Sequence, residues 1–169
     1  RLPFDVDRDF APVTNIFSLP LVIVGSPQFD ITTVQDLAKR IRDRPGEVNF
    51  ASTGPATAAH LAGEYFAQRV GGQMTHVPYR GSGPAIADLL AGNVKLMMDS
   101  LASALPNIQA GRTRALAVTS LQRLPALPDV PTVSETVSPG FDAIGWGGMV
   151  APAGTPPAII ERVNADVVR

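Results

Sequence analysis

Alternating strand and helix patterns constrain the fold of this chain more than any other feature of its sequence. The branched apolar run at 19–24 is typical of a buried strand, and residues 32–44 place apolar side chains at helical spacing. Further strand patterns occupy 48–51, 75–79, 94–98 and 114–119, alternating with helix patterns at 57–70, 82–90 and 103–110. Strands that alternate with helices pair mostly in parallel, through right-handed crossovers. The sequence therefore predicts an α/β fold with a mostly parallel sheet flanked by helices.

Capping signals indicate where several of these helices begin and end. Thr32 opens a Thr-Thr-Val-Gln capping box, and Pro45-Gly46 ends the helix that follows. Gly92 is the expected C-cap of the helix at 82–90. Three prolines at 124–131 favour an extended connector, after which 132–135 fits one capped helical turn. Thr155-Pro-Pro begins a final helix whose apolar stripe consists of Ile159, Ile160, Val163 and Val167.

The segment 48–61 is the most informative for function, because a short strand leads through small residues into the start of a helix. Ser52, Thr53 and Thr57 place hydroxyls beside backbone N–H groups, and Gly54 lets the chain approach a ligand closely. An anion there would meet unpaired N–H donors at the positive end of the helix. Carboxylate is favoured over phosphate, since the chain has no phosphate-loop motif or adjoining basic cluster. The alternative is a plain turn with Thr57 as an ordinary N-cap.

Polar or glycine-rich segments follow three consecutive strands, at 52–57, 79–82 and 99–100. The carboxyl ends of such strands are where α/β sheets collect ligands. Arg80 is a candidate grip for a second carboxylate, against the alternative of an exposed surface arginine. Asp99 could pair with a ligand ammonium or hold Arg80, or it could cap the next helix. The candidate binding residues are Ser52, Thr53, Gly54, Thr57, His60, Tyr79, Arg80, Gly81, Ser82 and Asp99.

The two histidines have local alternatives to a role in chemistry. His60 lies one turn into the helix after the loop, so it could reach a bound carboxylate or hydrogen-bond locally. His76 lies within a strand pattern and is expected to be a hydrogen-bonded structural histidine. Their separation gives no metal-ligand motif, and Ser52 lacks the glycine pattern of a nucleophile elbow. No catalytic residue, metal or other cofactor is therefore predicted.

Composition excludes several other classes of protein. The chain has no cysteine, which rules out thiol catalysis, disulfides and cysteine metal sites. Its net charge is −1 with the charges dispersed, so neither a nucleic-acid surface nor a polybasic membrane anchor is predicted. No apolar run approaches the length of a membrane span. The 169 residues suffice for one good core.

Three long motifs, at 74–94, 97–106 and 114–135, occur in the order found in the Bug/TctC family, which the chain resembles over nearly its whole length. The resemblance implies a type II periplasmic-binding-protein fold, in which two α/β lobes close over a small carboxylated solute. Residues 15–145 would form lobe two. Residues 1–14 would be a remnant of lobe one with the first crossing, and 146–169 the return crossing with the start of the C-terminal part of lobe one. A signal peptide and a first domain are expected to precede Arg1, and a family C-terminus to follow Arg169.

The resemblance also implies a function. The chain is expected to belong to a periplasmic receptor that captures a di- or tricarboxylate, a related organic acid or an acidic amino acid. Its partners would be the membrane components of a tripartite tricarboxylate transporter, or a sensor kinase. In the commonest family form, Ala-Ser-x-Gly-x-Gly-Thr, a second glycine stands where this chain has Ala56, and Pro55 removes one amide donor. Two alternatives are the effector domain of a cytoplasmic transcription regulator and an enzyme with His60 and Asp99 as an acid/base pair.

The segment 142–150 contains Gly145-Trp-Gly-Gly148, whose glycines are expected to let backbone segments approach closely. Trp146 is the only tryptophan, and a core or interdomain filler is the favoured explanation for it. In the family resemblance this segment crosses back from lobe two to lobe one.

Overall fold

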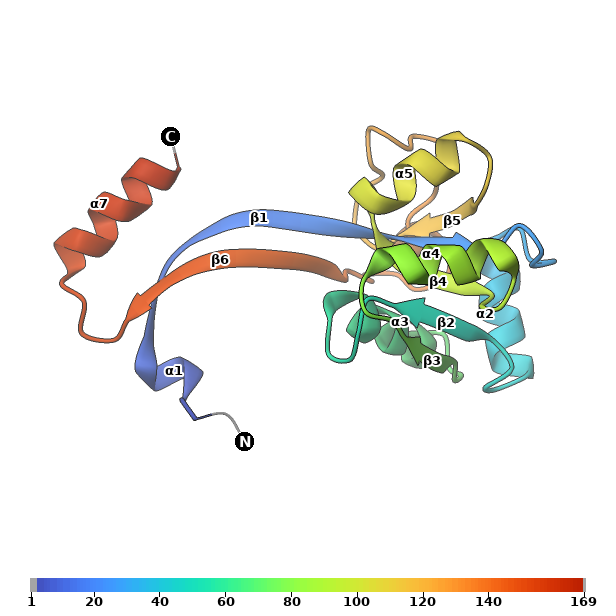
Figure 1. Ribbon diagram of the computed structural model, residues 1–169, viewed down its shortest axis with the longest axis horizontal. Helices are drawn as coiled ribbons and strands as arrows, with labels where there is room; N and C mark the ends of the chain where they lie inside the picture. The colour runs from blue at the N-terminus through green and yellow to red at the C-terminus, as the bar shows by residue number, and fades with distance from the viewer. Residues whose placement is uncertain (1–2, 169) are drawn as a thin grey trace. The chain divides into compact units, whose positions relative to one another are not determined.

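A computed structural model describes residues 3–168 (Figure 1). These residues form two compact units. The larger comprises Leu19–Gly145, and the smaller comprises the described parts of Arg1–Ser18 and Trp146–Arg169. The division runs through two strands, β1 (Phe10–Gly25) and β6 (Ile144–Pro152), which pair with each other.

The larger unit is built on a sheet with the order β3-β2-β4-β1-β5. Strand β2 (Asn49–Ser52) pairs in parallel with both β3 (Thr75–Pro78) and β4 (Leu96–Ser100). Strand β1 runs antiparallel to β4 and to β5 (Arg114–Val118). The predicted parallel pairing is therefore confirmed for β2 with β3 and β4, whereas both of these pairings of β1 are antiparallel, so the sheet is mixed.

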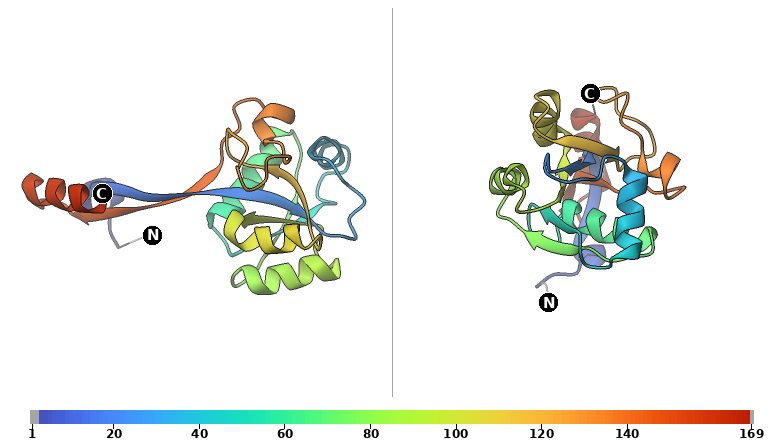
Figure 2. Two further views of the ribbon diagram at one scale, coloured as in Figure 1. Left: turned by 90° about the horizontal axis from the view of Figure 1, so that it is seen from above. Right: turned by 90° about the vertical axis from the view of Figure 1, so that its right-hand side faces the viewer.

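Two groups of buried side chains cover opposite faces of this sheet. Helices α2 (Val34–Asp43) and α3 (Ala58–Arg69) pack on one face around Phe50 and Phe66. Helices α4 (Ser82–Ala91) and α5 (Leu101–Gln109) pack on the other. Figure 2 shows the two helix pairs on either side of the strands. Residues of β1 alternate between the faces, with Ile23 in the first group and Val22 and Val24 in the second.

Hydroxyl caps fix the helix starts, and two of these starts lie one or two residues from the expected position. Helix α2 is capped by Thr33 rather than Thr32, because the Thr33 hydroxyl accepts from the Asp36 N–H. Helix α5 begins at Leu101, two residues earlier than expected, with Ser100 as its cap. The alternative of Asp99 as that cap is therefore wrong. The expected capped turn is present as α6 (Val133–Thr136), and Gly92 ends α4 with a φ of 81°.

The smaller unit contains α1 (Val6–Asp9), the first part of β1, most of β6, and α7 (Pro157–Val167). Added side-chain atoms at Gly147 and Gly148 would lie 2.3 Å from the Phe17 ring and 2.8 Å from the Thr14 carbonyl oxygen. The expected close backbone approach is thus present. Trp146 is 73% exposed, so it is not a core filler of the described residues, and its role as an interdomain filler stays a prediction. In the α7 stripe, Ile159 is 53% exposed. Across 3–168, no helix combines the length and apolar character of a membrane span.

Candidate ligand-binding site

The sheet register brings three strand ends to one edge. Ser52 lies opposite Pro78 in the β2–β3 ladder, and the Tyr79 N–H donates to the Ser52 carbonyl at 3.0 Å. Ala51 lies opposite Met97 in the parallel β2–β4 ladder, so Asp99 follows at the same edge. The loops 52–57 and 79–82 are therefore neighbours, with the end of β4 beside them.

Within the first loop, hydroxyl groups hold the backbone. The buried Ser52 Oγ accepts from the Gly54 N–H at 3.2 Å and lies 3.1 Å from the Gly54 carbonyl. The Thr57 hydroxyl donates to that same carbonyl at 2.8 Å and accepts from the His60 N–H at 3.4 Å. Both hydroxyls therefore shape the loop, and Thr57 is also the N-cap of α3.

The loop has a strained residue at Ala56. Its φ is +60°, a left-handed conformation that costs an L-residue about 1–2 kcal/mol and a glycine almost nothing. A glycine, as in the family form that the chain resembles, would adopt this conformation without that cost. The Ala56 N–H donates to the His60 ring at Nδ1 over 3.0 Å, so His60 contacts the loop backbone.

The first turn of α3 contains backbone donors without a protein partner within residues 3–168, on the exposed Ala58 and the buried Ala59. Among the described residues, neither the Ala58 nor the Ala59 N–H has a hydrogen-bond partner. The Thr53 hydroxyl and N–H, in the same part of the chain, likewise have no protein partner. Unpaired N–H groups at the positive end of a 12-residue helix suit a carboxylate. The loop is thus chemically equipped to bind an anion.

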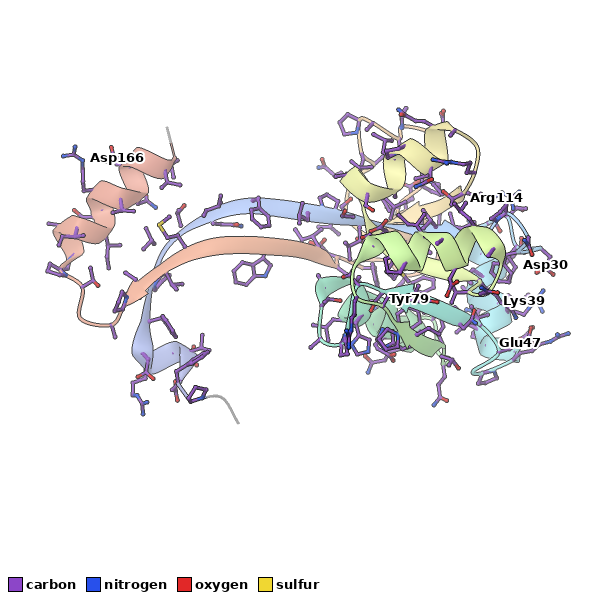
Figure 3. The ribbon with its side chains drawn as sticks, viewed as in Figure 1. Asp30, Lys39, Glu47, Tyr79, Arg114 and Asp166 are labelled. Atoms are coloured by element: carbon purple, nitrogen blue, oxygen red, sulfur yellow. The ribbon has the colours of Figure 1, made fainter. Side chains whose placement is uncertain are left out.

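In the loop 79–82, each side chain has a different environment. The Tyr79 hydroxyl donates to Asp88 of α4 at 2.7 Å, and Figure 3 shows Tyr79 beside that helix. Burial first, and then this carboxylate, raise the pKa of Tyr79 to about 12. Gly81, with a φ of +103°, begins α4 without a side-chain cap. Arg80 is exposed and has no ion pair within residues 3–168.

Asp99 joins two helix starts from a buried position. It is 1% exposed, and its Oδ1 accepts from the Ser82 hydroxyl at 3.0 Å and from the Ser100 N–H at 2.9 Å. Its Oδ2 has no partner among the described residues. Burial raises the pKa of Asp99, against the smaller effects of the Ser103 and Ser82 hydroxyls and the Ser100 N–H. Asp99 therefore does not hold Arg80.

His76, predicted only as a structural residue, is part of the loop's support. Its Nε2 lies 2.6 Å from Ser52 Oγ, which confirms that it is hydrogen-bonded. Its ring stacks on that of His60 with 3.8 Å between centroids and 16° between planes. Desolvation, and then His60, lower the pKa of His76, with Glu64 acting in the opposite direction. Sequence reasoning missed this role because the register that places His76 opposite Phe50 had to be known first.

His60 and Asp99 have different hydrogen-bond partners, and within residues 3–168 no hydrogen bond or ion pair joins the two. The described residues contain no group of three or more histidine, cysteine, aspartate or glutamate side chains placed to hold a metal ion.

Comparison with known proteins places the chain among solute receptors. The family model described as "Tripartite tricarboxylate transporter family receptor" matches residues 1–168. A UPF0065 protein of Pseudomonas sp. (strain P51), from a tcbD-tcbE intergenic region, is 46% identical over 99% of this chain and 50% of its own length. Protein BugT of Bordetella pertussis is 38% identical over 98% of this chain and 51% of its own length.

Two solved structures of Rhodopseudomonas palustris proteins are similar in fold. One, described with adipate, has a TM-score of 0.82 and 36% identity, covering 97% of this chain and 55% of that protein. The other, MatC with bound malate, has a TM-score of 0.83 and 31% identity, covering 100% and 57%. This chain spans about half the length of the curated relatives it matches. With a family match over 1–168 and relatives that include BugT, the chain belongs to the Bug/TctC family of tripartite tricarboxylate transporter receptors.

Proposed function

We propose that the chain supplies one side of the carboxylate site of a periplasmic solute receptor. The observation that carries the proposal is the loop 52–57 with the unbonded Ala58 and Ala59 N–H groups that follow it. Membership in a receptor family supports it, as do the adipate and malate in the titles of two structural neighbours. Both of those ligands carry two carboxylates, which favours a dicarboxylate for this chain.

The proposed contacts differ from one candidate residue to the next. One ligand carboxylate would accept hydrogen bonds from the α3 amides and Thr53, because these donors lack protein partners. The exposed Arg80 guanidinium would grip a second carboxylate through paired N–H donors. Supporting roles, which fix loop geometry rather than contact the ligand, are proposed for Ser52, Gly54, Thr57, His60, Tyr79, Gly81, Ser82 and Asp99.

A second lobe is part of this proposal, on energetic grounds. A helix N-terminus contributes about 0.3–2 kcal/mol to a bound anion, whereas micromolar affinity requires about 8 kcal/mol. Enclosure between two lobes excludes water and strengthens each polar contact. We assign lobe two to 15–145, and the crossings with parts of lobe one to 1–14 and 146–169. The receptor would deliver its ligand to the membrane components of a tripartite tricarboxylate transporter.

Calorimetric titration of the gene's full translation product tests the function. Malate, adipate and citrate should include at least one ligand with micromolar affinity. Matched monocarboxylates should bind at least about tenfold more weakly, since they lack one charged contact. The chain 1–169 alone should bind the same ligand far more weakly. Absence of binding to any carboxylate would contradict the proposal, and comparable micromolar binding by both proteins would contradict its two-lobe part.

A further inference from the structure

Two stacked imidazoles hold the two ends of the loop 52–57. At the strand end, His76 Nε2 lies 2.6 Å from Ser52 Oγ, which in turn accepts from the Gly54 N–H. At the helix end, His60 Nδ1 accepts from the Ala56 N–H at 3.0 Å. The rings stack with 3.8 Å between their centroids. The rings and their hydrogen bonds thus link β2, β3 and α3 beneath the loop.

The hydrogen bond to Ala56 requires one protonation state of His60. A ring nitrogen that accepts from an N–H carries no proton itself, so the bond specifies the neutral ring with its proton on Nε2. Once protonated, the ring has donors at both nitrogens and can no longer accept from Ala56. Ala56 would then lose the contact that holds its left-handed backbone in place.

We propose that His60 is a positioning residue, which in its neutral Nε2–H form fixes the Ala56 amide and thereby presents Thr53 and the α3 amides to a carboxylate. His76 supports the His60 ring through the stack of the two imidazoles. The ligand part of this inference rests on the proposed function.

The groups around the His60 ring fit this tautomer. Glu64, on the same helix, has Oε1 3.8 Å from His60 Nε2, the nitrogen that carries the proton in this form. From β3, the His76 ring stacks on that of His60. From β2, the Ser52 hydroxyl contacts His76.

Nitrogen NMR of the imidazole rings in chain 1–169 tests the structural part without any ligand. At about pH 7.5 we expect His60 to show an unprotonated Nδ1 and a protonated Nε2. The opposite tautomer would overturn the proposal. Because this readout is independent of ligand binding, it separates a failure of the inference from a failure of the proposed function.

Titration of the gene's full translation product with malate and with adipate tests the functional part. His60→Asn keeps an acceptor near the position of Nδ1, so its affinity should stay within about threefold of wild type. His60→Ala removes that acceptor and should weaken binding about tenfold. His76→Gln, which keeps a partner for Ser52, serves as the matched control at the second ring. Equal affinities of wild type and His60→Ala, or equal losses in His60→Asn and His60→Ala, would overturn the proposal.

Discussion

Replacing Ala56 by glycine tests the strained loop directly. The left-handed backbone costs alanine about 1–2 kcal/mol, which glycine avoids. Glycine also has more freedom in the unfolded chain, which lowers stability by about 0.5–1 kcal/mol. The difference leaves Ala56→Gly more stable than wild type by up to about 1.5 kcal/mol.

Ala87→Gly is the matched control, because Ala87 is exposed in the interior of α4. The same chemical change should there destabilise the protein by about 1 kcal/mol, the ordinary helix penalty. Urea denaturation of both variants, monitored by circular dichroism, measures the two changes with opposite expected signs. Equal destabilisation by the two substitutions would show that Ala56 does not adopt the left-handed conformation.

Further substitutions test the loop, the Arg80 contact and the buried Asp99. Thr57→Ala and Thr33→Ala each remove a helix cap, and each should lower the free energy of unfolding in urea by about 1 kcal/mol. Only Thr57→Ala should also weaken malate binding, by about tenfold in calorimetry. Equal malate affinities of Thr57→Ala and wild type would remove Thr57 from the site. Arg80→Lys should weaken the binding of dicarboxylates more than that of monocarboxylates, because an ammonium lacks the paired donors. Arg112→Lys, just before β5, is the control and should change neither affinity. Equal losses of affinity for both ligand types in Arg80→Lys would show that Arg80 does not bind the second carboxylate. Burial raises the folded-state pKa of Asp99 above its unfolded value, so its contribution to stability is greatest below about pH 4 and declines as the pH rises through the folded pKa. Asp99→Asn should remove that decline in unfolding free energy, and an unchanged pH profile would show that Asp99 does not cause it.

Features determined by residues adjacent in the sequence were predictable, and features determined by strand pairing between distant segments were not. The caps at Thr57 and Gly92 follow from a few adjacent residues, and the structure has both. The start of α5 was misplaced because Ser100 and Ser103 are both acceptable caps at that strand end. The reversed direction of β1 depends on contacts between segments more than 70 residues apart, which no local pattern encodes.

The candidate site shows the same distinction. The hydroxyl-rich loop was recognisable because small polar residues precede a helix. That the Thr57 hydroxyl donates its hydrogen bond to the Gly54 carbonyl could be known only from the folded backbone. The stacking of His60 on His76 depends on the β2–β3 register. Burial of Asp99 depends on two helices that start beside it, and so its pairing with Arg80 was a reasonable but wrong alternative.

Amide NMR of the gene's full translation product, titrated with malate or adipate, tests the central claim most directly. The claim is that a carboxylate binds at the start of α3 through backbone N–H groups. The Thr53, Ala58 and Ala59 amide protons should shift downfield in proportion to occupancy, because each gains a charge-assisted hydrogen bond. Saturable binding that shifts amides elsewhere, for example along α2 around Lys39, while these three stay unchanged would contradict the account.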